Sequence, residues 1–272
     1  MPKKKKRKKS KKRKVKTRKK KLKKAKSKKI ENTELIYKPK SDWIKKAIVN
    51  KSGYEKKYSE SIKNNDNFWK KEGKRITWIK PYTKIKDYKY SKTDVNIKWF
   101  YDGTLNASAN CIDRHLKKNK DKTAIIWVGD DPKVQKKISY KQLHQEVSKA
   151  ANGLKEIGVK KGDRVTIYLT MIPELAYTML ACARIGAVHS IIFGGFSADS
   201  ITGRINDCKS DYVITADEGV RGGKIIHLKA TVDEALLNCP NVKKCVVVKR
   251  TGNRINWDES RDVWYHDITK KA

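Results

Sequence analysis

The sequence predicts an α/β protein with a mostly parallel sheet and helices on both faces. Short apolar, β-prone runs recur along the chain after about residue 109, and segments with helical signals lie between them. The apolar runs are nearly continuous, which is typical of strands buried on both faces. We see no internal repeat in the sequence.

Each element of this alternation has its own signal. Strands are expected at residues 123–129, 164–170, 187–193, 211–217 and 243–249, and helices at 139–157, 173–185, 198–208 and 232–237. Ser139 stands three residues before Gln142, which is the spacing of a capping box, and Gly158 ends that helix. Pro173 fits the first position of its helix, and Ser197 can cap the next one. The helix that begins at Pro173 is apolar on most faces, so we expect it to be buried on two sides.

Residues 31–112 are predicted to form an N-terminal extension. From Ile30 to about Asp94 the chain is polar, contains scattered aromatic residues and lacks a sustained apolar period, so we expect a segment draped on a larger domain. A short helix is expected at residues 55–64. Phe68, Trp69 and Trp78 are expected to be buried anchors, because a few large aromatic side chains bury much area.

Residues 1–30 are predicted to be a disordered, Lys/Arg-rich tail. Residues 2–29 hold 21 of the chain's 67 lysines and arginines and no acid, so about +17 of the formal charge of +38 belongs to the rest. Such a segment repels itself and cannot bury a core. We expect salt-sensitive, non-specific binding to nucleic acid or another polyanion, since the tail lacks aromatic rings that stack on bases. A nuclear localisation signal is the alternative.

The rest of the composition indicates a soluble, cytoplasmic protein. The five cysteines form no CxxC or Cys/His pattern with metal spacing, so no metal site is assigned. Scattered cysteines in odd number suit a reducing compartment. The chain contains no apolar run of about 18–20 residues, and no apolar stretch follows the basic N-terminus. We therefore expect neither membrane association nor secretion.

Two glycine pairs follow consecutive predicted strands and mark the candidate site. They are Phe193-Gly194-Gly195 and Arg221-Gly222-Gly223-Lys224. Ligands of parallel sheets bind at the carboxyl ends of strands, so the two loops are expected side by side at one edge. Phe193 offers a flat face to a planar ring, while Arg221 and Lys224 can converge on an anionic group. This combination indicates a nucleotide; alternatively, both pairs only form tight strand-to-helix turns.

The remaining polar residues give no catalytic assignment. The five histidines have no carboxylate or cysteine partner at a telling spacing, and we interpret them as structural: His115, His144, His189, His227 and His266. Asp217 and Glu218 are expected to cap or orient the loop that follows them.

Three stretches carry a resemblance to a known family. They are "WFYDGTLNASANCIDRHL", "IPELAYTMLACARIGAVHSIIFGGFSADSITGRINDCKSDYVITADEGVRGGK" and "DVWYHDI". From about Tyr54 to the end, the chain resembles AMP-forming acetate–CoA ligases (acetyl-CoA synthetases) of the acyl-adenylating superfamily. The resemblance implies that residues 31–112 form the family's N-terminal extension and residues 113–272 an incomplete AMP-binding domain.

The resemblance also implies a reaction and its ligands. Members convert ATP, acetate and coenzyme A into AMP, pyrophosphate and acetyl-CoA, with Mg²⁺ and through acetyl-adenylate. The loops at 193–195 and 221–224 match positions that contact coenzyme A in the family. Lys224 stands where the family usually has Arg, so the charge is kept but the bidentate fork is lost.

One expected part is missing from the sequence. In the family, a Ser/Thr/Gly-rich phosphate loop follows the stretch that matches "VWYHDI", and nothing like it occurs here. We therefore expect an N-terminal fragment that is inactive alone, with no catalytic residue and with the ATP and Mg²⁺ sites outside the chain. The alternatives are a non-catalytic polyanion-binding protein with a ligase-like remnant, and a ligase for another short-chain acyl acid.

Overall fold

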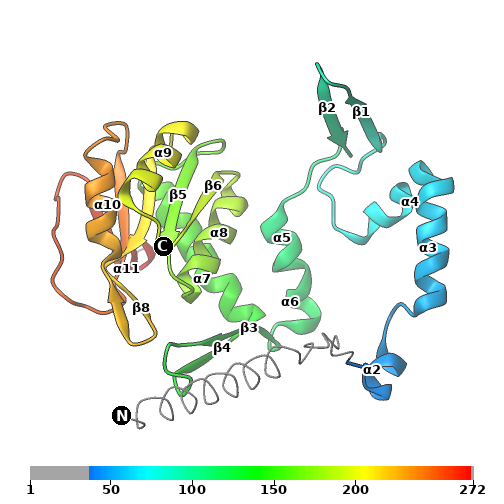
Figure 1. The fold of residues 1–272 in the computed structure, drawn as a ribbon, viewed down its shortest axis with the longest axis horizontal. Coiled ribbons are helices and arrows are strands. Elements are labelled where there is room, and N and C mark those ends of the chain that lie inside the picture. The colour runs from blue at the N-terminus through cyan, green and yellow to red at the C-terminus, as the bar shows by residue number, and fades with distance from the viewer. Residues whose placement is uncertain (1–36, 271–272) are drawn as a thin grey trace, which may run out of the picture. The chain divides into compact units, whose positions relative to one another are not determined.

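The computed structural model describes residues 37–270 (Figure 1). The chain divides into two compact units, residues 1–60 and 61–272, which are described separately. The predicted basic tail lies outside the described residues. The first unit contains α2 (Ser41–Lys46) and most of α3 (Lys51–Lys63), whose last turn belongs to the second unit. Both helices contain only exposed or half-buried residues, and α3 begins four residues before the predicted helix.

The second unit begins with a small aromatic region. Its elements are α4 (Asn65–Glu72), the 3-10 turn η1 (Gly73–Arg75) and an antiparallel hairpin of β1 (Lys86–Tyr90) with β2 (Val95–Trp99). The prediction of three buried anchors is wrong: Phe68 and Trp78 are half-buried, and Trp69 is 36% exposed. The reason is that these rings pack on one another and not beneath a layer of helices. The Trp78 ring, for example, lies 4.8 Å from that of Tyr82, between centroids.

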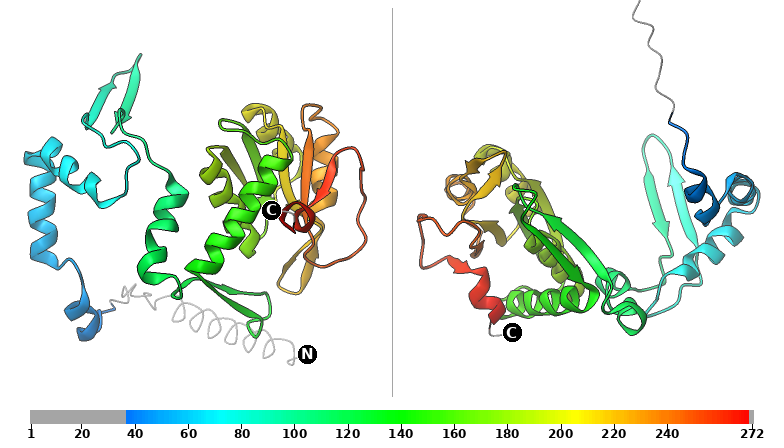
Figure 2. Two further views of the ribbon diagram at one scale, coloured as in Figure 1. Left: turned by 180° about the vertical axis from the view of Figure 1, so that it is seen from behind. Right: turned by 90° about the horizontal axis from the view of Figure 1, so that it is seen from below.

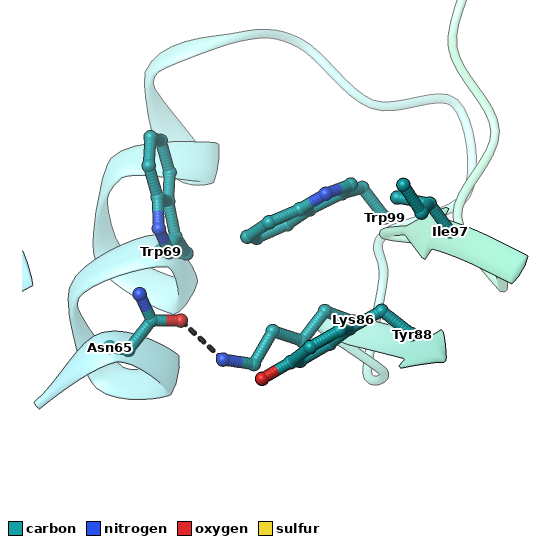
Figure 3. A pocket seen from close by; sticks show the side chains of 6 residues that line it. All are labelled: Asn65, Trp69, Lys86, Tyr88, Ile97 and Trp99. Atoms are coloured by element: carbon teal, nitrogen blue, oxygen red, sulfur yellow. Dashed lines mark hydrogen bonds between the residues drawn. The ribbon is translucent and has the colours of Figure 1, made fainter. Parts of the chain in front are cut away.

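A groove of about 310 Å³ opens between α4 and the β1–β2 hairpin. Its lining residues are Asn65, Trp69, Lys86, Tyr88, Ile97 and Trp99. Figure 3 shows the indole rings of Trp69 and Trp99 turned toward each other, with Lys86 donating to the side-chain oxygen of Asn65. Lys86 also pairs with Asp66 at 3.0 Å. The lysine therefore ties the hairpin to α4.

Two short helices, α5 (Ala107–Cys111) and α6 (Asp113–Asn119), connect this region to the α/β part. The Asn106 side chain accepts from the N–H of Ala109 to cap α5, and it donates to the carbonyls of Ala183 and Arg184. Asp113 makes a bidentate pair with Arg184, with both distances 2.7 Å. Hydrogen bonding to this guanidinium holds the pKa of Asp113 below its usual range. These contacts fix the connecting helices to the end of α8 (Pro173–Ile185).

The central sheet has five parallel strands in the order β11-β10-β7-β5-β6. They are β5 (Arg164–Leu169), β6 (Val188–Phe193), β7 (Tyr212–Ala216), β10 (Lys244–Val248) and β11 (Asp262–Trp264). This confirms the predicted fold class. The edge strand β11 was not expected, because its three residues give too short an apolar signal.

Helices cover both faces of the sheet (Figures 1 and 2). They are α7 (Tyr140–Glu156), α8 (Pro173–Ile185), α9 (Ala198–Cys208), α10 (Leu228–Leu236) and α11 (Tyr265–Lys270). Right-handed crossovers in opposite directions along the sheet put α8 and α9 on opposite faces. The capping box of Ser139 and Gln142 is formed, and Pro173 opens α8. Every residue of α8 is buried or half-buried, as its apolar composition predicts.

Besides the β1–β2 hairpin, two further antiparallel pairs lie outside the parallel sheet. They are β3 (Thr123–Val128) with β4 (Gln135–Ser139), and β8 (Gly219–Arg221) with β9 (Lys224–Ile226). The apolar run at 123–129 is therefore a strand, but it pairs with a local partner and not with the main sheet. Among residues 37–270, no helix combines the length and apolar composition needed to cross a membrane.

Candidate functional site

The candidate site lies at the topological switch point of the sheet. The chain goes from β5 to the edge strand β6, then crosses to β7 on the other side of β5 and continues to β10 and β11. Loops after β5 and β7 therefore diverge at the carboxyl ends of the strands, where ligands of such sheets bind. Both predicted glycine loops lie at the carboxyl ends of the strands.

The first loop, Phe193-Gly194-Gly195, turns sharply from β6 toward α9. Gly195 has φ +132°, a conformation that side chains disfavour. The hydroxyl of the buried Tyr168 accepts from the N–H of Gly195 and donates to the carbonyl of Phe196, both at 3.0 Å. Burial raises the pKa of the Tyr168 phenol. A protonated phenol on β5 therefore fixes the shape of this loop.

Replacing Tyr168 with Phe is expected to lower the free energy of unfolding by about 1–3 kcal/mol, because a backbone donor and a carbonyl lose their buried partner. Urea denaturation measures the change. Tyr90→Phe, at a tyrosine that is 79% exposed, is the matched control and should change stability little. Equal effects for the two variants would contradict the assigned role of Tyr168.

The second loop is the turn of the β8–β9 hairpin. Gly222 and Gly223 occupy the turn with φ +58° and +73°, and Arg221 faces Lys224 across the strand pair. The alternative of two strand-to-helix turns therefore describes the first glycine pair but not the second. The Arg221-Lys224 spacing belongs to a hairpin that carries a cation on each side of its turn.

The two loops meet through side chains. The guanidinium carbon of Arg221 lies 5.9 Å from the ring centroid of Phe193, within the range of a cation–π contact. The Phe193 ring lies 6.1 Å from that of Phe196, over which Arg204 lies at 4.8 Å. The predicted adjacency of the two loops is therefore confirmed, whereas ligand binding by them stays a prediction. Sequence reasoning missed Phe196 and Arg204, although Phe196 follows the glycine pair directly.

The side chains of Phe193, Arg221 and Lys224 are accessible to solvent. Phe193 is 60% exposed, and both Arg221 and Lys224 are exposed. The cluster therefore presents a ring face and two cations to solvent, which can engage a planar group and an anion together.

Asp217 and Glu218 accept hydrogen bonds that hold the loop after β10 in place. The Asp217 carboxylate accepts from the backbone N–H groups of Arg250 (2.8 Å) and Gly252 (2.8 Å), among others. Glu218 accepts from Thr251 (2.7 Å) and from His227 (2.9 Å). Hydrogen bonding to Thr251 is the main reason that the pKa of Glu218 lies below its usual value. Both acids thus orient the 250–253 loop after β10, more than the loop that follows them.

Three of the histidines lie close to a carboxylate. His227 pairs with Glu218, and Nε2 of His144 lies 3.5 Å from Asp113. His266 lies 3.5 Å from its neighbour Asp267. Sequence spacing hid the first two pairs because their members belong to separate elements. The described residues contain no group of three or more His, Cys, Asp and Glu side chains that could hold a metal ion.

The β3–β4 hairpin lies against loops at the carboxyl ends of the strands. The indole N–H of Trp127 donates to the carbonyl of Met171, after β5, at 2.7 Å. The guanidinium carbon of Arg250 lies 5.1 Å from the Trp127 ring centroid. The loops after β5 and β10 thus both contact this hairpin.

The fold and this edge define a parallel α/β protein with an exposed ring-and-cation surface at the carboxyl ends of its strands. The chain belongs to the AMP-binding enzyme family, whose model matches residues 112–270. Residues 54–111 match a second model, described as "Acetyl-coenzyme A synthetase N-terminus". These matches confirm the family resemblance read from the sequence.

Similar proteins agree with this membership. The chain is 59% identical over 237 residues to a protein named acetyl-coenzyme A synthetase from Parvibaculum lavamentivorans, covering 87% of this chain and 37% of that protein. It is 56% identical over 245 residues to a protein of the same name from Shewanella pealeana, covering 89% of this chain and 37% of that one. The chain therefore spans little more than a third of the length of these relatives.

A solved structure shares the fold. An acetoacetyl-CoA synthetase from Streptomyces lividans superimposes with a TM-score of 0.70 at 24% sequence identity. The match covers 80% of this chain and 33% of that one.

Proposed function

We propose that this chain is part of an AMP-forming acetate–CoA ligase and contributes part of its coenzyme A site. The proposed reaction converts acetate, ATP and coenzyme A into acetyl-CoA, AMP and pyrophosphate through acetyl-adenylate. The observation that carries the proposal is the contact between Arg221 and the exposed Phe193 ring at the carboxyl ends of the strands. The names of the similar proteins support acetate as the acyl substrate.

Four side chains have distinct roles in the proposed coenzyme A site. The Phe193 ring stacks on the adenine of coenzyme A, and Arg221 and Lys224 bind its phosphates by charge-assisted hydrogen bonds. Tyr168 holds the Phe193 loop in shape. We assign no ATP or Mg²⁺ ligand to the residues of this chain. We infer that the 272-residue chain alone does not form acetyl-adenylate.

The Lys/Arg-rich run at residues 2–29 supports one additional role, which is non-specific polyanion binding by the tail. This role is independent of the coenzyme A site, because it depends on a different part of the chain.

Arg221→Ala is expected to weaken coenzyme A binding by about 10- to 150-fold, because one charge-assisted phosphate contact contributes roughly 1.5–3 kcal/mol. An NMR titration of the 272-residue chain with coenzyme A measures the affinity even when it is millimolar. Arg75→Ala removes an equal charge from the exposed η1 turn and should leave the affinity unchanged.

The full-length ligase that carries this chain gives a second readout. There, Arg221→Ala should raise the KM for coenzyme A and leave pyrophosphate release during acetyl-adenylate formation nearly unchanged. An equal loss in both steps would refute the assignment of Arg221 to coenzyme A.

A further inference from the structure

The tip of the β8–β9 hairpin has little support of its own. At its base, Gly219 is buried, and a Cβ there would lie 2.6 Å from Cγ2 of Thr170. At its tip, a Cβ added to Gly222 or Gly223 would meet no described atom within 4 Å other than those of the glycine and its two chain neighbours. The two strands have three residues each, and so short a hairpin is marginally stable alone.

Asp130 supplies the missing support from a distant part of the sequence. Its Oδ1 accepts from the N–H of Gly222 at 2.6 Å, and its Oδ2 accepts from the N–H of Gly223 at 2.8 Å. A carboxylate that binds two consecutive backbone N–H groups fixes both the position and the direction of the turn. These bonds link residues that are 92 and 93 positions apart in the sequence.

The segment that carries Asp130 is itself anchored. Asp130 stands in the turn between β3 and β4, which closes with a hydrogen bond from Gly129 to the carbonyl of Val134. The indole N–H of Trp127, three residues earlier, donates a hydrogen bond to the carbonyl of Met171. Asp130 and Trp127 therefore link the tip of the β8–β9 hairpin to the loop after β5.

We propose that Asp130 is a positioning residue for the coenzyme A site. By holding the Gly222–Gly223 turn, it sets where the flanking Arg221 and Lys224 point, including the approach of Arg221 to the Phe193 ring. Asp130 does not touch the ligand in this arrangement, because both its oxygens face the turn. This inference rests on the proposed function, and its test separates the two.

The variants are Asp130→Ala, Asp130→Asn and, as matched control, Asp131→Ala. The neighbouring Asp131 also accepts a backbone hydrogen bond, but from Lys133 within its own turn. The probe is coenzyme A, titrated into the 272-residue chain and followed by NMR. Asp130→Ala should weaken binding about tenfold, through loss of two charge-assisted bonds that order the site. Asp130→Asn keeps one carbonyl acceptor and should fall between Asp130→Ala and wild type, whereas Asp131→Ala should match wild type.

Two readouts distinguish positioning from a general loss of structure. Without coenzyme A, Asp130→Ala should speed amide hydrogen exchange at Gly222 and Gly223 while exchange in the central strands stays unchanged. In the full-length ligase, the KM for coenzyme A should rise while acetyl-adenylate formation stays constant.

The outcomes separate the inference from its basis. If Arg221→Ala weakens binding but Asp130→Ala does not, the positioning role is wrong and the proposed function stands. Tighter binding by Asp130→Ala would also overturn it, since Asp130 would then compete with phosphate for the turn. If the wild-type chain does not bind coenzyme A at millimolar concentration, both the positioning role and the proposed site on this chain fall.

Discussion

The Lys229→Met variant of the 272-residue chain is expected to lose about 3–5 kcal/mol of unfolding free energy, because it removes the buried ammonium that pairs with the buried carboxylate of Asp262. Lys229 stands on α10 and is 1% exposed, and its Nζ lies 2.6 Å from Asp233 and 2.8 Å from Asp262. It also donates to the carbonyl of Asn256 at 3.2 Å. A single ammonium thus connects α10, the long loop before β11 and β11 itself.

The network around Lys229 explains the size of the effect. Arg261 bonds to both acids, with Nη2 at 2.7 Å from Asp233 and Nε at 2.8 Å from Asp262. Burial by itself raises the pKa of Asp262, but hydrogen bonds from Arg261 and Lys229 outweigh it and hold the pKa below its usual range. Asp262 therefore stays ionised, and without Lys229 the two acids share one guanidinium.

Urea denaturation of wild type and variant measures this loss. Lys243→Met is the matched control, because Lys243 makes a 2.8 Å pair with Asp211 but its side chain is 65% exposed. Exposed pairs contribute at most about 1 kcal/mol. Similar losses for the two lysines would show that burial of the network does not determine its strength.

A double variant isolates the pair. Asp262→Asn removes the buried charge that Lys229→Met leaves without its ammonium partner, so the double variant should be more stable than the sum of the two single effects predicts. Additive effects would mean that Lys229 and Asp262 stabilise the fold independently.

The helices and strands that the sequence predicted correctly depend on signals between residues that are close together in the chain. The capping box of Ser139 with Gln142 and the position of Pro173 place two helices within a residue or two, since each signal acts on the adjacent turn. The apolar strands β5, β6, β7 and β10 were predicted for the same reason. β11 was missed because its three residues give too short an apolar signal, and the Lys229 network that fixes its position joins residues separated by up to 33 positions.

The candidate site was predictable in outline only. Parallel strands bring their carboxyl ends to one edge, so the adjacency of the Phe193 and Arg221 loops followed from the alternation of strands and helices. The groups that shape those loops did not follow, because Tyr168 and Asp130 act through backbone N–H groups far along the chain. Hydrogen bonds of this kind leave no spacing pattern in a sequence.

The Asp217→Ala variant should show the second large effect, a loss of about 3 kcal/mol, since the backbone donors of one loop lose a shared, buried acceptor. Asp217 is 1% exposed, and its carboxylate accepts from Arg250, Thr251 and Gly252 as well as from the N–H of Glu218. Asp217→Asn keeps one oxygen but turns an amide N–H₂ toward donors, so it should recover only part of the loss.

The Asp217 effect should be local before it is global. Hydrogen exchange measured by mass spectrometry should rise first at residues 249–253, since this loop is partly exposed and can open to water while the central strands stay folded. Asp211→Ala, which breaks the more exposed pair with Lys243, is the control and should leave that loop protected. Because Arg250 contacts Trp127 from this loop, its opening also removes one support of the β3–β4 hairpin that carries Asp130. Asp217→Ala should therefore speed exchange at Gly222 and Gly223 as well; unchanged exchange there would mean that the hairpin holds its position without the β10 loop.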